Sequence, residues 1–379
     1  MTTPSTAAAH QMPAAKDERI KEISRFRRAI IRPELGAICG TIAVFVFFFV
    51  LAGGTAMFTL EGAMSWSTVS AQFVVLAVGV CLLMIAGEFD LSLGSMVGFS
   101  GMIFALLTIA VGLPVWLSIL LALMLACALG AINGILVVRT GLPSFIVTLA
   151  FMFILRGLTI WSAISLTRQT VVSGMGDAAA NDPLAKLFGG KVFTSLFHWL
   201  ADHGIIATFA RGARAGQPVV DGVPMLIVWA IGLLIFGQWL LTRTKFGNWI
   251  FATGGDPQAA RYVGVPVTRV KIIMFMFASV CAALLGIEQV VEFGSAAADR
   301  GLMKEFEAII CVVIGGALLT GGYGSVIGAA LGAVIFGVVQ QGLFFTNVES
   351  SLFRVFLGTI LLGAVIANTY IRRLITGER

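Results

Sequence analysis

The chain has 379 residues, of which 58% are hydrophobic and only 12% are charged. So few charges cannot cover a water-soluble protein of this size, and the same apolar content excludes intrinsic disorder. The net charge is +6, but the lysines and arginines flank apolar segments and do not alternate with aromatic residues, which excludes a nucleic-acid groove. The composition predicts an all-α fold, a polytopic membrane helix bundle.

Apolar segments that are long enough to cross a bilayer recur along the chain, since each span needs about 20 mostly apolar residues. The expected spans lie near residues 36–58, 69–87, 91–111, 114–138, 143–164, 223–241, 272–291, 308–319, 325–345 and 352–370. They amount to about ten transmembrane helices, counted at the length that a bilayer core requires. An even number of spans places both termini on the same side of the membrane.

The basic residues decide which side that is. They gather in the N-terminal tail (1–35), in the loop at 242–270 and in the C-terminal tail (372–379), and basic loops face the cytoplasm. We therefore expect cytoplasmic N and C termini on either side of a single transmembrane domain, 36–371. The long polar segment at 165–222 then faces the periplasm.

The most unusual stretch is 87–95, which reads G-E-F-D-L-S-L-G-S. Its carboxylates, Glu88 and Asp90, and its hydroxyls, Ser92 and Ser95, lie between two apolar spans. Polar groups at membrane depth line a cavity or pair with one another. One interpretation is a broken helix that lines a substrate path. The other is an interfacial loop in which Asp90 or Ser92 caps the third span; we favour a capping role for Asp90, which is compatible with a place in the path.

A short surface helix is predicted in the cytoplasmic loop, within residues 246–267. Asp256 suits the N-cap, Pro257 the first helical position, and Gly264 the left-handed position after the helix. These end signals are unusually complete for a connector, so we expect something to dock on this helix.

Three further charged residues fall in or near the spans. Arg156 lies inside the fifth span, where Asp90 or Glu288 are conceivable partners, but we favour the interpretation that it extends to a membrane interface. Glu288 and Glu292 are one turn apart at an outer helix end and are interpreted as solvated.

No motif for catalysis or metal binding is present in the sequence. It contains no GxxxxGK[ST], so a transporter driven by ATP needs a separate ATPase chain. It has neither HExxH nor GxSxG. Its five cysteines stand apart, and His198 and His203 are poorly spaced for one helical face. We expect no catalytic residue, no metal and no cofactor in this chain.

Four motifs, in order, resemble those of the simple-sugar permeases of ABC importers, the family of ribose, xylose and fructose permeases. They are 87–95, Asn133-Gly134 with 143–150 and Arg156-Gly157, 246–264, and 314–324. The resemblance implies a ten-helix subunit of the bacterial inner membrane, paired with a second permease copy. It also implies an ABC ATPase subunit, which uses ATP with Mg, and a periplasmic sugar-binding protein that delivers a simple sugar or polyol.

The resemblance also suggests which residues act. The substrate pathway is expected to include Glu88, Asp90, Ser92, Ser95, Asn133 and Thr148. The loop helix is expected to be the coupling helix that seats in the ATPase, through Asp256, Ala259, Ala260, Arg261 and Gly264. Glu88 and Phe89 depart from the family motif, which has Gly and Ile there, and the sugar stays open.

Two alternatives remain beside the importer. An ion-coupled secondary transporter of a small polar solute would use Asp90 or Glu88 as its proton or sodium carrier. A membrane enzyme or scaffold would need a catalytic or assembly motif that the sequence does not display. The predicted coupling helix favours the importer.

Overall fold

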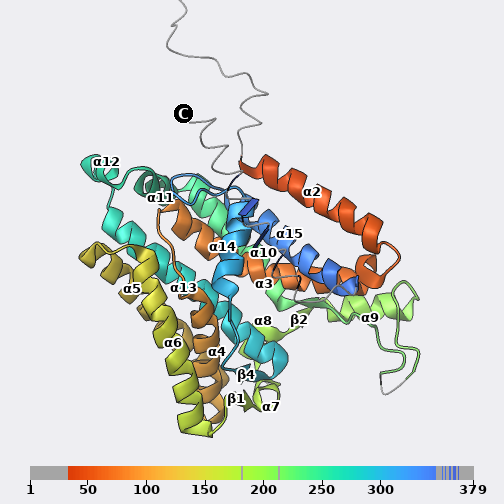
Figure 1. Cartoon of the computed structure of the whole chain (residues 1–379). Helices are drawn as coiled ribbons and strands as arrows, with labels where there is room; N and C mark the ends of the chain where they lie inside the picture. The colour runs from red at the N-terminus through yellow and green to blue at the C-terminus, as the bar shows by residue number, and fades with distance from the viewer. Residues whose placement is uncertain are drawn as a thin grey trace, which may run out of the picture.

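The computed structural model describes residues 33–180, 182–211 and 214–346, together with isolated positions between 352 and 366. Figure 1 shows a bundle of long helices, with α12 at one end and the short elements β1, β4 and α7 at the other. Seven helices in the described residues are long and apolar enough to cross a membrane. They are α2 (Pro33–Ala52), α3 (Leu60–Ile85), α5 (Val115–Thr140), α6 (Ser144–Thr167), α10 (Met225–Arg243), α13 (Val267–Phe293) and α15 (Val326–Phe345).

Two shorter helices occupy the places of expected spans. They are α4 (Leu93–Ile109), with 17 residues, and α14 (Lys304–Ile314), with 11 residues. The last expected span, 352–370, lies outside the described residues apart from isolated positions. The all-α membrane bundle is confirmed, whereas the number of spans and the side of the termini stay predictions.

Several boundaries differ from the expected ones because local signals act beyond the apolar runs. α3 begins at Leu60 instead of near residue 69, because the Thr59 hydroxyl accepts a hydrogen bond from Gly62 N at 3.3 Å and caps the helix. α14 ends at Ile314 because Gly316 has a φ of +88°, which no helix continues through.

Most of the remaining elements are short and belong to the segment 165–222, which was expected to be a loop. They are β1 (Val171–Ser173), α7 (Met175–Ala179), α8 (Pro183–Gly189), β2 (Lys191–Val192) and α9 (Thr194–Asp202), and β3 (Val223–Pro224) follows the segment directly. β1 pairs antiparallel with β4 (Ser295–Ala297), with Val172 opposite Ala296, and β2 pairs with β3. The segment therefore folds back on the ends of α10 and α13.

The centre of the bundle is made by α3, α13 and α15, of which α15 is as buried as α13. In its most apolar window α3 is 83% buried and α13 is 67% buried, whereas α2 and α10 are only 17% and 22% buried. The chain thus places its exposed apolar faces on peripheral helices, where a membrane or a second subunit covers such surfaces. A short 3-10 helix, η1 (Ala56–Phe58), joins α2 to α3.

The loop at 242–270 is almost entirely helical. α11 (Lys245–Gly255) and α12 (Pro257–Tyr262) follow α10 and lead into α13. α12 precedes α13 and β4 follows it, so this loop and the segment 165–222 lie at opposite ends of one 27-residue helix. Such a helix is about 40 Å long, which exceeds the hydrocarbon core of a bilayer.

Candidate translocation site

The polar segment after residue 87 is a break between two buried helices. α3 ends at Ile85, and Gly87, two residues later, has a φ of +84°. Gly87 N donates to Met84 O at 2.9 Å and Glu88 N to Leu83 O at 3.1 Å. These two bonds satisfy carbonyls that the helix end leaves open. Glu88, Asp90 and Ser92 are all buried. The burial favours the broken-helix interpretation over a solvated loop.

Two hydroxyls of α6 hold the backbone of the break. Phe89 N donates to Ser144 Oγ and Leu91 N to Thr148 Oγ1, both at 3.0 Å. Phe89 and Leu91 are two residues apart in an extended chain, a distance of about 6.6 Å. Ser144 and Thr148 are one helical turn apart, about 5.4 Å, so the two hydroxyls are spaced closely enough to meet both amides. Thr148 therefore contacts the break, and its place in the substrate pathway stays a prediction. Ser144 was missed, although its spacing of four residues from Thr148 is a readable signal.

A chain of side-chain hydrogen bonds continues from Asp90 to α5. Asp90 Oδ1 accepts from Ser92 N at 2.8 Å and from Ser92 Oγ at 2.6 Å, and Asn133 Nδ2 donates to Ser92 Oγ at 3.1 Å. Asp90 Oδ2 and Asn133 Oδ1 are buried and accept no hydrogen bond within the described residues. The break thus presents two hydrogen-bond acceptors that receive no donor from the described residues, which we call the open acceptors, close to the Ser92 hydroxyl.

The expected capping role of Asp90 needs a correction. Ser92 occupies the N-cap position of α4, and no side chain caps it there. Ser92 already has helical angles, with φ −82° and ψ −10°, so the carboxylate reaches only the Ser92 amide and not the amides of the first helical turn. Asp90 instead stabilises the turn that leads into α4.

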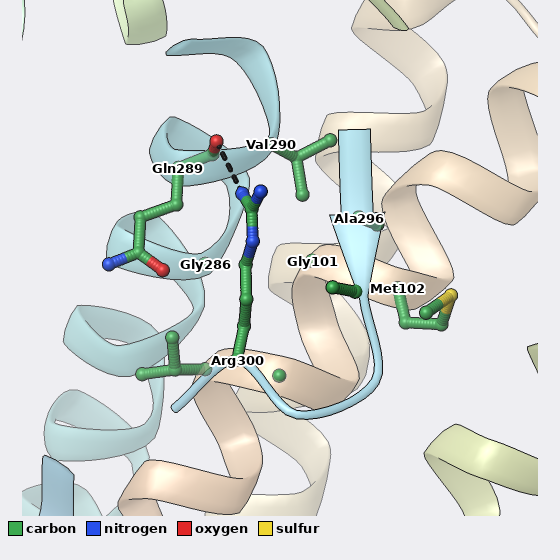
Figure 2. Close-up of a pocket in the computed structure, with 10 residues that line it drawn as sticks. Gly101, Met102, Gly286, Gln289, Val290, Ala296 and Arg300 are labelled. Atoms are coloured by element: carbon green, nitrogen blue, oxygen red, sulfur yellow. Dashed lines mark hydrogen bonds between the residues drawn. The ribbon is translucent and has the colours of Figure 1, made fainter. Parts of the chain in front are cut away.

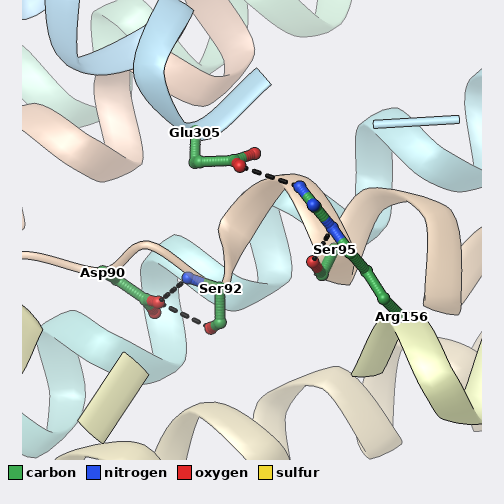
Figure 3. A network of polar contacts seen from close by, with 5 residues as sticks. All are labelled: Asp90, Ser92, Ser95, Arg156 and Glu305. Carbon is green, nitrogen blue, oxygen red and sulfur yellow. Dashed lines mark hydrogen bonds and ion pairs between the residues drawn. The ribbon is translucent and has the colours of Figure 1, made fainter. Parts of the chain in front are cut away.

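An ion pair lies beyond the start of α4 (Figure 3). Arg156 Nη2 is 2.9 Å from Glu305 Oε1, and Arg156 Nε donates to Ser95 Oγ at 3.1 Å. The side chain of Glu305 is fully buried and that of Arg156 is 30% exposed. The interpretation that Arg156 merely extends to an interface is wrong, and its partner is neither Asp90 nor Glu288. Glu305 fits there because Gly94 has no side chain that would collide with its carboxylate.

Two other acidic residues differ from expectation. Glu288 is buried in α13, whereas Glu292 is exposed, so the interpretation of both as solvated is wrong for Glu288. The reason is that α8 packs over this end of α13, with Gly189 against Val291. Glu88 was expected in the substrate pathway, which stays a prediction; its carboxylate forms an ion pair with Lys271 of α13, a partner that was not foreseen.

A crevice between α4, α13 and β4 is closed by Arg300 (Figure 2). Its guanidinium donates to Gln289 O at 2.8 Å and to Ser295 Oγ at 3.3 Å, and lies 4.5 Å from the centre of the Phe293 ring. The crevice is too narrow to admit a water molecule. It offers no open route between these helices.

The end signals of α12 have the predicted geometry. Asp256 Oδ1 accepts from Gln258 N at 2.9 Å and from Ala259 N at 3.0 Å, and Gly264 has a φ of +83°. The preceding helix α11 was missed, because glycines 247, 254 and 255 resemble a loop. Thr244 caps α11 by accepting from Gly247 N at 3.1 Å.

The exposed face of α12 is not the one expected. Ala260 is buried against the chain itself, so it cannot belong to a docking surface, whereas Ala259 and Arg261 are exposed. Because the helix has fewer than two turns, the sequence did not show which alanine faces inward. The exposed apolar groups are Tyr262, at 91%, and Val263, at 79%.

A bundle of long apolar helices, broken at a buried polar segment, has the organisation of a multi-pass transport subunit. The chain belongs to the family described as branched-chain amino acid transport system / permease component, whose profile matches residues 62–365. It is a multi-pass protein of the inner membrane.

Characterised relatives match most of the chain. The xylose transport system permease protein XylH of Escherichia coli (strain K12) is 31% identical over 89% of this chain and 91% of its own length. The ribose import permease protein RbsC of the same strain is 30% identical over 82% of this chain and 86% of its own length. No solved structure matches the chain. The resemblance to simple-sugar permeases that the four motifs indicated is confirmed.

Proposed function

We propose that the chain is the permease subunit of an ATP-driven importer for a simple sugar or polyol. The observation that carries the substrate class is the buried break with its open acceptors, Asp90 Oδ2 and Asn133 Oδ1. Sugar hydroxyls are neutral donors and acceptors; the Thr148 hydroxyl of α6 contacts the break, and the Ser95 hydroxyl lies in the first turn of α4, which follows it. The relatives that transport xylose and ribose support the same class.

The proposed partners follow from the two ends of α13. At one end α12 exposes Tyr262 and Val263, an apolar patch of the kind that a protein partner covers. We assign this end to the cytoplasmic ATPase subunit, which binds ATP and Mg. At the other end the folded segment 165–222 faces the periplasm and receives the sugar-binding protein. The apolar outer helices pack against lipid and a second copy of the chain.

Uptake measurements test this function against ion-coupled transport. The chain is reconstituted in vesicles with its ATPase and binding protein and assayed with pentoses, hexoses and polyols. We expect uptake of at least one of them that requires ATP, stops with vanadate and continues with a protonophore at fixed ATP. Uptake that a protonophore abolishes, and that proceeds without ATP, would instead support Asp90 or Glu88 as an ion carrier.

The coupling role of α12 gives a second expected result. Gly264 has a left-handed backbone, and a Cβ at this residue would meet no neighbouring atom within 4 Å. Gly264→Val therefore acts only through backbone strain, which costs about 1–2 kcal/mol. We expect normal amounts of protein in the membrane but much weaker retention of the ATPase in a pull-down. Gly264→Asn is the control, because Asn tolerates this conformation. Equal retention for all three proteins would contradict the assignment.

A further inference from the structure

Both flanks of α12 touch the break at consecutive residues. On the α11 side, Gly254 packs against Gly87, with 3.3 Å between the Gly254 Cα and the position of a Cβ at residue 87. On the α13 side, Lys271 forms its ion pair with Glu88. Residues 87 and 88 are therefore held by the two chain segments that enter and leave α12.

A third segment completes the junction on the side of Gly87. Gly322 N, in the loop between α14 and α15, donates to Ile85 O at 2.9 Å. A Cβ at Gly321 would lie 2.7 Å from Gly87 Cα. These contacts join backbone to backbone, without side chains that can change rotamer. Closely packed elements of this kind move together rather than deform independently.

The contact on the side of Glu88 is different, because it can open. The Lys271 side chain is 18% exposed and that of Glu88 is 9% exposed. In an ion pair so far removed from water, separating the two groups or losing one partner leaves a poorly solvated charge, which is costly. The similar family motif has glycine at the position of Glu88, so this ion pair is a feature of this chain and not of the motif.

We propose that the Glu88–Lys271 ion pair is a latch that holds the break in its resting conformation and ties that conformation to α12. The proposal rests on the function proposed above. When the ATPase displaces α12, the end of α11 and the start of α13 move, and the break changes conformation only if the ion pair opens. The latch thereby opposes the movement of α12 and the break, and with it ATP hydrolysis by the ATPase, until a sugar-loaded binding protein is present.

The test measures ATP hydrolysis by the complete transporter in vesicles, with and without sugar-loaded binding protein. The variants are Glu88→Gly, Lys271→Gln and the exchange Glu88→Lys/Lys271→Glu. For the two single variants we expect hydrolysis without binding protein to rise about fivefold or more, the lower range of ordinary coupling between sites. The exchange variant should return toward the wild-type rate. Arg269→Gln is the control, since it removes an equal charge from an exposed residue two positions away.

Glu88→Gly keeps the test decisive if Lys271→Gln assembles poorly, because glycine is the residue of the related motif. A resting rate in Glu88→Gly equal to that of the wild type would overturn the latch, as would an equal rise in Arg269→Gln. Failure of the exchange variant to recover would also contradict it. Wild-type hydrolysis that no sugar-loaded binding protein stimulates would refute the importer itself, and the latch with it.

Discussion

Replacing Gly254 with alanine is expected to remove most of the folded protein from the membrane, whereas alanine at the adjacent Gly255 leaves it at the wild-type level. A Cβ at residue 254 would collide with Ile85 O and lie 2.6 Å from Gly322 N, and both are backbone atoms that cannot turn aside. Overpacking of this kind costs about 1–3 kcal/mol, and an unyielding backbone favours the upper end. At residue 255 a Cβ meets nothing within 4 Å.

The two alanine variants are well matched, because both glycines lie at the end of α11 and each replacement raises the helix propensity by the same amount. The amount of purified protein and its thermal unfolding midpoint in detergent provide the measurement. A common midpoint for both variants would show that the junction has room for a side chain, and that α11 does not pack on the end of α3 as described.

The parts of the site that the sequence predicted depend on neighbouring residues. α12 follows from Asp256, Pro257 and Gly264, whose effects act within one or two helical turns. The break was readable because carboxylates interrupt an apolar run, which is costly wherever the chain then folds. In both cases the physical cause lies inside a window of about ten residues, roughly the scale of cap and turn signals.

The pairing of charges was not predictable in the same way. Arg156 and Glu305 are separated by 149 residues, and Glu88 and Lys271 by 183. Arg156 alone indicates that a partner is needed but not which carboxylate supplies it. In the sequence, Asp90 and Glu288 were conceivable partners and an arginine at the membrane interface was favoured, whereas the helical start of α14 brings Glu305 to the place that Gly94 leaves empty.

The same limitation applies to the segment 165–222. Its polar composition predicted a loop, because its short elements have too few residues for a recognisable period. What orders β1 is pairing with β4, where Val171 lies opposite Ala297, far along the chain. α8 is a different case, because Asp182 caps it by accepting from Leu184 N at 2.8 Å and Ala185 N at 3.3 Å, with Pro183 at the first helical position. This local signal was missed in the sequence, and Trp229 Nε1 adds a distant contact by donating to Leu187 O at 2.8 Å. Structure that depends on distant partners leaves little trace in its own sequence.

The Arg156–Glu305 ion pair leads to the second large effect. Arg156→Met leaves the fully buried Glu305 carboxylate without its cation. Breaking a buried pair in this way costs about 3–5 kcal/mol, enough to deplete folded protein in the membrane. Glu305→Gln is milder, because a neutral amide is far cheaper to bury and still accepts a hydrogen bond from Arg156.

The double variant Arg156→Met/Glu305→Met separates the cost of a lone charge from the contribution of the pair. Removing both charges leaves no buried ion, so the double variant should be more stable than Arg156→Met alone. Unfolding midpoints of the wild type, Arg156→Met, Glu305→Met and the double variant in detergent provide the comparison. Strictly additive losses would mean that the two side chains do not interact. A restored fold without transport would place the pair in the path, since the charges would then be needed for passage and not for folding.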